Sequence, residues 1–202
     1  WRWQRRAMDM SFLRSVSPLD SGPVIEGKTL TLRMPLGSDY AAWARVRSES
    51  RAFLAPWEPT WAADELTRAA YKRRIRHYQK DLRDETGCAF FVVRRGDDAL
   101  IGGLTLSNVR RGVTQSASLG YWMGVRHAGQ GYMTEAVAMV QPYVFRTLWL
   151  HRLEAACLPR NGASIRVLEK AGFSREGLAR RYLKINGQWQ DHYLYAVLAD
   201  DR

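Results

Sequence analysis

The middle of the chain carries three β-rich runs in close succession, GCAFFVVRR, ALIGGLTLSNV and SASLGYWMGV, within residues 87–125. Short turn-forming stretches, GDD and RRG, separate them. Strands joined by turns this short pair in antiparallel fashion, because parallel neighbours need a crossover of about a dozen residues or more. The three runs therefore predict an antiparallel meander within a sheet.

Helical and extended patterns alternate around this meander. Residues 28–35 alternate like a strand, and a helix capped by Ser38 is expected over 40–47, ending at an extended proline-containing loop, 54–61. Pro142 lies inside a later predicted helix and lacks an N–H, so we expect an irregularity there. The other expected elements are helices over about 64–84, 133–148 and 161–173, a strand over 151–158, and a hairpin around Asn186-Gly187. The order β, α, α, β, β, β, α, β, α, β, β predicts a single mixed α/β domain.

Composition limits the number of domains and the class of protein. A chain of 202 residues with 46% hydrophobic content can bury one core, which we place in residues 23–202. Residues 1–22 lack the periodic pattern and are interpreted as a flexible N-terminal extension. The apolar runs fall well short of the roughly 20 residues of a membrane span, and Cys88 and Cys157 have no CxxC or CxxH spacing. A soluble, cytoplasmic protein with core thiols and no metal site is expected.

The charge balance is strongly basic. Lys and Arg number 31 against 20 Asp and Glu, a formal net charge of +11. Such a balance favours a polyanionic partner, such as RNA or a ribosome, or an anionic ligand. A basic solvated surface without a specific partner explains the charge equally well, and no run of five or more like charges marks a nucleic-acid arm.

The stretch VRHAGQGYMTEAV, residues 125–137, joins the third β-rich run to the helix that follows it. Gly129 and Gly131 lack a Cβ, so backbone amides can approach a ligand closely, and Arg126 adds a cation. The first turn of a helix has N–H groups without internal partners and carries the positive end of the macrodipole. The loop therefore fits a pyrophosphate, although the loop alone would be interpreted as an ordinary strand-to-helix turn. It is neither a P-loop nor a dinucleotide fingerprint, since GK[ST], a third glycine and the later ribose-binding acid are missing.

Arg126-x-x-Gly129-x-Gly131 resembles the [RQ]-x-x-G-x-[GA] pyrophosphate loop of the GNAT superfamily of N-acetyltransferases, and the predicted element order is similar to that fold. The resemblance implies a GNAT-type, largely antiparallel central sheet flanked by helices, with acetyl-CoA as co-substrate. Further stretches, spread over roughly residues 24 to 198, resemble the RimJ-type branch of ribosomal-protein alanine N-acetyltransferases. They are FLAPWEP (53–59), LSNVRRG (106–112), LGYWMG (119–124), NGASIRVLEKAGFSREG (161–177) and INGQWQDHYLYAVL (185–198). This branch implies an acceptor that is the N-terminal α-amine, on alanine, of a small-subunit ribosomal protein.

The resemblance also implies roles for individual residues. Ser164 would donate a proton to the departing thiolate, and Asn161 would contact the pantetheine, although Asn161 is equally suited to cap its helix. Main-chain groups of Met123 and Val125 would contact the pantetheine and the thioester carbonyl. The residues implied to bind the co-substrate are Met123, Val125, Arg126, Gly129, Gln130, Gly131, Tyr132 and Asn161.

A strong local base is missing. Many relatives carry a glutamate on the strand before the glycine loop, whereas here no acidic residue occurs between Ala99 and Thr134. Glu135 would repel a diphosphate, so we expect it to face away. Glu58, in the proline-bracketed loop, is the candidate to attract or deprotonate the amine, directly or through water. A site without a strong base suits an α-amine, with a pKa of about 7.7–8.0, better than a lysine at about 10.4.

Two other functions are compatible with the sequence. An acetyltransferase for a small amine, such as an antibiotic or a polyamine, would have a closed acidic acceptor pocket. A non-catalytic acyl-CoA-binding or ribosome-assembly protein would use its basic surface alone. The oligomeric state stays open. Aromatic residues at strand spacing more often pack in the core, so we expect one or two of five to line an acceptor groove, with Asp191 and His192 as a polar patch. The five are Trp57, Trp61, Tyr182, Trp189 and Tyr193.

Overall fold

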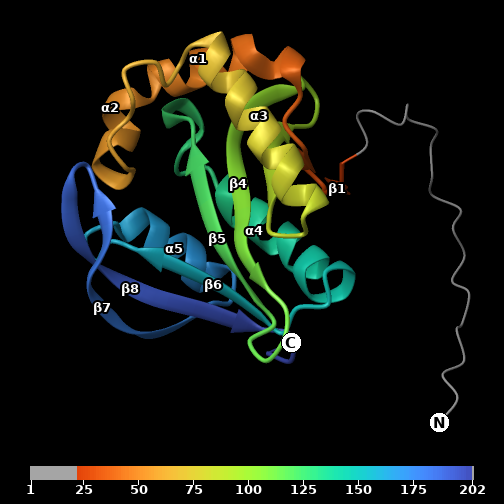
Figure 1. Cartoon of the computed structure of the whole chain (residues 1–202), viewed down its shortest axis with the longest axis vertical. Helices are drawn as coiled ribbons and strands as arrows, with labels where there is room; N and C mark the ends of the chain where they lie inside the picture. Colours follow the sequence, from red (N-terminus) through yellow and green to blue (C-terminus); the bar gives the residue numbers. More distant parts are fainter. Residues whose placement is uncertain (1–21, 202) are drawn as a thin grey trace, which may run out of the picture.

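The computed structural model describes residues 22–201, so the extension expected at residues 1–22 lies, apart from Gly22, outside the described residues. An eight-stranded sheet in the order β1-β2-β3-β4-β5-β6-β8-β7 forms the centre of the fold (Figure 1). All neighbouring strands are antiparallel except β5 and β6, which are parallel. The mixed α/β fold class with a largely antiparallel sheet is confirmed. No helix of residues 22–201 is long and apolar enough to cross a membrane.

The strands are β1 (Val24–Glu26), β2 (Leu30–Arg33), β3 (Cys88–Arg94), β4 (Ala99–Arg110), β5 (Ser116–Met123), β6 (Arg152–Cys157), β7 (Ser174–Ile185) and β8 (Gln188–Leu198). The α-helices are α1 (Tyr40–Glu49), α2 (Arg51–Leu54), α3 (Arg68–Arg83), α4 (Tyr132–Pro142) and α5 (Gly162–Lys170). The predicted meander is β3, β4 and β5. The three-residue strand β1 and the one-turn helix α2 were not among the expected elements.

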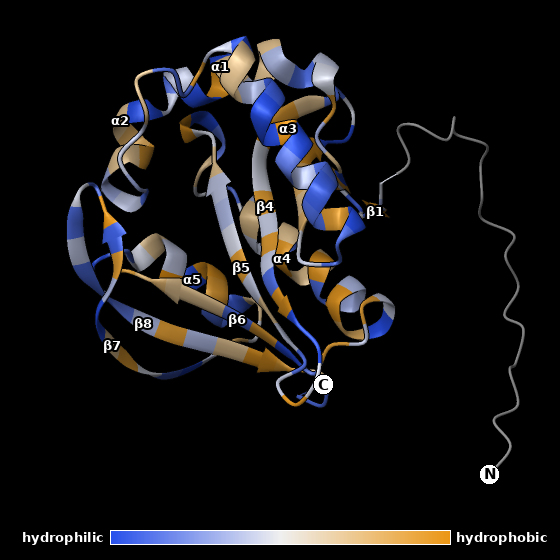
Figure 2. Ribbon diagram, viewed as in Figure 1, coloured by the Kyte–Doolittle hydropathy of each residue, from blue (hydrophilic) through white to orange (hydrophobic). Residues whose placement is uncertain are grey.

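Helices cover both faces of the sheet. Side chains of β3 alternate, so that Phe91 and Val93 pack in a cluster with Trp43 of α1 and Tyr71 of α3. The intervening side chains, such as Phe90, belong to the larger cluster that includes residues of α4 and α5. This period of two follows from the strand geometry. The outer face of α3 is hydrophilic (Figure 2).

The expected cap of α1 is wrong. Ser38 lies inside a 3-10 turn, Gly37–Asp39, and Asp39 is the residue that precedes the helix. The Asp39 carboxylate accepts a hydrogen bond from the Leu36 N–H at 2.8 Å and pairs with Arg33 at 2.7 Å. The carboxylate therefore stabilises the turn before α1, where Ser38 was expected to act.

Two further boundaries differ from expectation. α3 begins at Arg68, because Thr67 caps it by accepting the Ala70 N–H at 3.1 Å, and the preceding residues 64–67 form turns. The loop over 54–61 is not extended throughout, since its first proline lies in a 3-10 turn, Ala55–Trp57. Proline is compatible with the first turn of a helix, where its missing N–H costs nothing.

The irregularity expected near Pro142 is confirmed. α4 ends at Pro142, and a π-helical segment, Tyr143–Thr147, follows it. The Leu148 N–H donates to the Tyr143 carbonyl, five residues earlier, at 2.9 Å. A proline has no N–H, and its ring crowds the carbonyl four residues before it. The α-helical hydrogen-bond pattern therefore gives way to a π-helical one at this point.

The hairpin expected at Asn186-Gly187 is also confirmed, because these residues join β7 to β8. Their φ angles are 44° and 80°, both in the left-handed region that a type I′ turn requires.

β5 and β6 pair over only part of their lengths. Their parallel register runs from Ser116 and Arg152 to Leu119 and Ala155. Beyond Leu119, β5 continues to Met123 without a partner strand on this side. The sheet therefore opens at the carboxyl ends of these two strands.

Candidate active site

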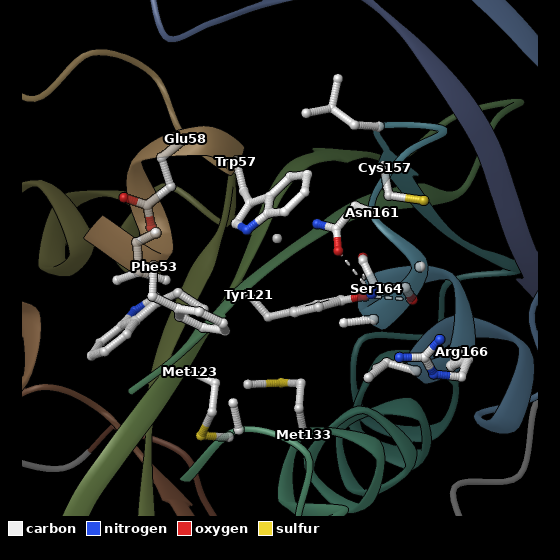
Figure 3. Close-up of a pocket in the computed structure, with 18 of the residues that line it drawn as sticks. Phe53, Trp57, Glu58, Tyr121, Met123, Met133, Cys157, Asn161, Ser164 and Arg166 are labelled. Carbon is white, nitrogen blue, oxygen red and sulfur yellow. Dashed lines mark hydrogen bonds between the residues drawn. The ribbon is translucent and has the colours of Figure 1, made fainter. Parts of the chain in front are cut away.

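A cavity of about 660 Å³ occupies this opening between β5 and β6 (Figure 3). Its walls come from segments that are far apart in the chain. They are the 53–58 segment, β5, the glycine loop with the start of α4, the end of β6, the first turns of α5, and the β7–β8 hairpin. Most of the residues expected at the site from the sequence therefore line one cavity.

The glycine loop forms one end of the cavity. Gly129 and Gly131 have φ angles of 76° and 87°, a conformation that L side chains rarely adopt, and both line the cavity. A Cβ at either position would meet nothing within 4 Å, so the backbone faces open space. Gly131 precedes α4, and no side chain caps this helix. The N–H groups of its first turn are therefore available to an anion.

Three of the expected co-substrate residues lie outside the cavity wall. The Val125 N–H donates to Ser50 Oγ at 2.9 Å, so this main-chain donor already has a partner. Arg126 pairs with Glu49 at 3.1 Å, with 74% of its side chain exposed. Gln130 donates its side-chain amide to the Arg126 carbonyl at 2.9 Å. By contrast, Met123, Gly129, Gly131, Tyr132, Asn161, Ser164 and Glu58 all line the cavity.

Other basic side chains face the cavity that the sequence interpretation did not select. Arg166 and Lys170 lie one turn apart on α5 and line the cavity, and Arg160 lines it from the loop before α5. His127 also lines it, and burial together with the cation of Arg94 lowers its pKa. The sequence did carry a signal for these two residues. Arg166 and Lys170 are four positions apart in the helix that follows Asn161, and residues four apart lie on one face of a helix.

Ser164 lies in a compact polar cluster. The Asn161 side chain accepts the Ser164 N–H at 3.1 Å, so Asn161 does cap α5. Ser164 Oγ lies 2.7 Å from the Tyr121 hydroxyl, which points at it across the cavity (Figure 3). Burial raises the pKa of Tyr121, so this phenol stays protonated at neutral and mildly alkaline pH. Burial likewise raises the pKa of the Cys157 thiol to about 11, although the neighbouring Ser164 hydroxyl lowers it.

Tyr121 was missed because the sequence interpretation considered only main-chain roles for residues 121–125. The alternation of β5 carries the missing signal. Tyr121 is two residues from both Leu119 and Met123, and all three pack with the larger hydrophobic cluster, whereas Trp122 packs with the cluster of α1 and α3, as alternation along a strand requires.

Glu58 lines the cavity but is held by other groups. Arg47 donates to both of its carboxylate oxygens, at 2.6 and 2.7 Å, and the Trp61 indole N–H donates at 2.7 Å. Arg47 is buried, with 6% exposure, and its guanidinium lies over the rings of Trp61 and Trp122 at 4.3 and 5.0 Å. Glu58 is therefore an oriented carboxylate with part of its hydrogen-bonding capacity already used.

Glu135 faces away from the cavity, as expected. Its carboxylate accepts the Thr29 N–H at 3.1 Å and also bonds the Thr29 hydroxyl. This contact joins α4 to the turn before β2.

The part of the cavity that the 53–58 segment lines is mainly apolar. Phe53, Leu54 and Trp57 line it, and Glu58 is the one acidic residue in the whole lining formed by residues 22–201. The Asn186 N–H donates to the Glu58 carbonyl at 2.9 Å, which ties the β7–β8 hairpin to this loop. Among the five aromatic residues expected at an acceptor groove, Trp57 lines the cavity. The lining does not include Trp61, Tyr182, Trp189 or Tyr193, and of the expected polar patch it includes His192 and not Asp191.

Comparison with known proteins identifies the family to which this chain, with its split sheet and glycine loop, belongs. Residues 29–174 match the profile of the family described as the acetyltransferase (GNAT) domain, which is well over half of the chain. The chain belongs to the GNAT family. It is 41% identical over 178 residues to the probable N-acetyltransferase YjcK of Bacillus subtilis (strain 168), covering 88% of this chain and 98% of that one. It is 33% identical over 181 residues to the [ribosomal protein uS5]-alanine N-acetyltransferase of Escherichia coli (strain K12), covering 89% and 93%.

A solved GNAT structure matches the fold closely. Mycobacterium smegmatis RimJ in complex with CoA-disulfide superimposes with a TM-score of 0.81 at 34% identity, covering 89% of this chain and 87% of that one. The chain is thus an acetyl-CoA-dependent N-acetyltransferase, in agreement with the family resemblance of its motifs.

Proposed function

We propose that this enzyme acetylates the N-terminal α-amine, on alanine, of a small-subunit ribosomal protein. The observation that carries the proposal is the similarity to the E. coli uS5-alanine enzyme, which extends over 89% of this chain and 93% of that one. The chemistry of the cavity supports it independently. An apolar acceptor end beside Phe53, Leu54 and Trp57 suits a small first residue such as alanine.

The acceptor end is poorly suited to a polycationic amine. Glu58 is the one acid in the described lining, and Arg47 holds both of its oxygens. A polyamine carries several positive charges and would leave most of them without a counter-charge in a low-dielectric wall. An α-amine carries one charge at most, and with a pKa of about 7.7–8.0 it needs little help to lose its proton.

The co-substrate would lie along the opening of the sheet. The diphosphate would accept hydrogen bonds from the amides between Gly129 and the first turn of α4, since these donors face open space. The pantetheine would pass the end of β5, where Met123 has no partner strand on the β6 side, and reach Asn161. Arg166 and Lys170 line the cavity and would supply positive charge to the co-substrate, a role for which Arg126 is less well placed because it pairs with Glu49.

Ser164 is our candidate to stabilise the leaving thiolate. Its hydroxyl lies in the cavity wall and has the Tyr121 phenol as a neighbour at 2.7 Å. When the phenol donates to Ser164 Oγ, the serine proton is free to point into the cavity, where negative charge develops on sulfur. Glu58, the other candidate, would attract the acceptor amine, and water would take the amine proton.

The test is steady-state acetylation of synthetic peptides that differ only at the first residue or the first amine. We expect a peptide with a free N-terminal alanine to be acetylated with a higher kcat/KM than the same peptide starting with leucine. The same alanine peptide with a blocked N-terminus and an internal lysine should be inert. Spermidine and an aminoglycoside serve as the small-amine controls. A kcat/KM for either that exceeds the alanine peptide's would replace the proposal with the small-amine function.

A further inference from the structure

The β7–β8 hairpin contains a wide bulge beside the cavity. Ala179 pairs with His192 and Leu183 pairs with Gln190, so residues 180–182 lie opposite Asp191 alone. Arg181 takes a left-handed φ of 48°, and its N–H donates to Asp191 Oδ1 at 2.8 Å. A bulge of this kind re-aims side chains and recurs next to functional sites. Here it leaves Arg180, Arg181 and Tyr182 exposed and without paired residues on β8.

The bulge and the turn next to it combine cations with exposed aromatic rings. Arg180, Arg181 and Lys184 are exposed, and none forms an ion pair within the described part of the chain. Residues 177–190 contain no acid. Tyr182 is 48% exposed, and Trp189, which pairs with Lys184 across the hairpin, is 62% exposed.

We propose that this hairpin, residues 177–190, binds single-stranded RNA. Lys and Arg neutralise phosphates, and exposed aromatic rings stack on unpaired bases, so the two together are the composition of a surface for single-stranded nucleic acid. The net charge of +11 on the whole chain adds long-range attraction. The proposal concerns binding and is independent of the acceptor proposed above.

The same observations disfavour two other occupants. β7 is an edge strand, but pairing it with β7 of a second copy would bring two rows of Arg and Lys together without counter-charges. An acidic peptide would meet the cations but leave the exposed Trp189 ring without a stacking partner. RNA satisfies both features.

α3 is the other basic element and provides a matched control. Much of its charge is paired within the described residues: Arg73 with Asp64, Arg74 with Glu65, and Lys80 with Asp84. Three of its other exposed cations, Lys72, Arg76 and Arg83, have no large exposed aromatic residue among them. Replacing these three removes the same charge as replacing Arg180, Arg181 and Lys184.

The experiment measures fluorescence anisotropy of a labelled 20-nucleotide single-stranded RNA titrated with the full chain at several salt concentrations. The hairpin variant is Arg180→Gln, Arg181→Gln, Lys184→Gln, and the control is Lys72→Gln, Arg76→Gln, Arg83→Gln. We expect the hairpin variant to lose at least 10-fold in affinity at low salt and its log–log salt slope to fall by about 2, since each single-strand phosphate contact contributes about 0.7. The control should lose less than 3-fold. Trp189→Ala should lose on the order of 10-fold, with an unchanged salt slope.

Any of four results would overturn the proposal. Wild-type protein that does not bind the RNA removes it outright. Equal losses in the hairpin and control variants mean diffuse attraction to the whole basic surface. Unchanged affinity in Trp189→Ala, or displacement of the RNA by an acidic peptide of equal charge at equal concentration, means that charge alone acts there. Melting curves of all variants confirm that the exposed substitutions leave the fold intact.

Discussion

The Tyr121 hydroxyl and Ser164 Oγ lie 2.7 Å apart, although 43 positions separate these residues in the chain. One is on β5 and the other on α5, so the contact spans the opening of the sheet. Burial keeps the phenol protonated by raising its pKa. Tyr121 is thus a positioning residue in our account, which fixes the direction of the serine proton.

Ser164→Ala should lower kcat more than it raises KM for acetyl-CoA, because the contact matters mainly once charge develops on sulfur. A loss on the order of 10- to 100-fold is expected, since general acid–base steps are worth about 10²–10⁴-fold and water replaces part of the effect. Steady-state kinetics at saturating acceptor peptide, with a melting curve, give the answer. An unchanged kcat with reduced thermal stability would mean that Ser164 only packs against its neighbours.

Tyr121→Phe should lower kcat by about 10-fold while leaving KM for acetyl-CoA unchanged, because only the hydroxyl is lost. If Tyr121 acts through Ser164, the double variant with Ser164→Ala should be no slower than Ser164→Ala alone. A double-mutant cycle measures this coupling. Fully additive losses would show that the two hydroxyls act separately.

The pH profile of kcat/KM for the acceptor peptide should rise through the α-amine pKa, about 7.7–8.0, because the neutral amine is the nucleophile. It should then stay level to about pH 10, since the raised pKa of Tyr121 keeps the phenol protonated, and the Cys157 thiol, at about 11, also stays neutral. Rates measured from pH 6 to 10 test this. A falling limb near pH 9 that disappears in Tyr121→Phe would contradict it.

Negative charge introduced into the glycine loop by substitution should abolish binding of the co-substrate. Gly129→Glu with Gly131→Glu puts two carboxylates where the α4 amides face open space, and calorimetry with CoA should show no binding. Gly129→Ala with Gly131→Ala imposes the same backbone strain without charge, so it should retain more affinity. Wild-type affinity in the folded glutamate variant would place the diphosphate elsewhere.

Breaking the Arg47–Glu58 pair should destabilise the fold. Glu58→Gln leaves the buried Arg47 without its counter-charge, at a cost of about 3 kcal/mol. Arg47→Met with Glu58→Leu removes both charges and should be more stable than Glu58→Gln. Thermal melts of the three proteins compare them, and a Glu58→Gln variant as stable as wild type would show that the pair contributes little.

Local patterns predicted much of the fold, and long-range contacts explain most of what they missed. The meander, the β7–β8 hairpin and the irregularity at Pro142 follow from turn residues, alternation and the missing proline N–H. Strand β1 is three residues long and paired on one side, so too little pattern exists to reveal it.

In the candidate site, too, local motifs predicted some residues and contacts remote in sequence determined others. The glycine loop, Asn161 and Ser164 lie in short motifs, and the structure brings them to one cavity. Glu49, which holds Arg126, and Ser50, which binds the Val125 N–H, are remote in sequence. No spacing rule within the 125–137 stretch could have indicated that these partners turn two of the expected groups away from the cavity.

The most direct test of the central claim is mass spectrometry of ribosomal-protein N-termini from cells with and without this protein. The account predicts that one small-subunit protein with an N-terminal alanine is acetylated at its α-amine when the enzyme is present and unmodified when it is absent. The Ser164→Ala enzyme should restore the modification only partially. Identical N-terminal acetylation of every ribosomal protein in the two cell populations would contradict the account.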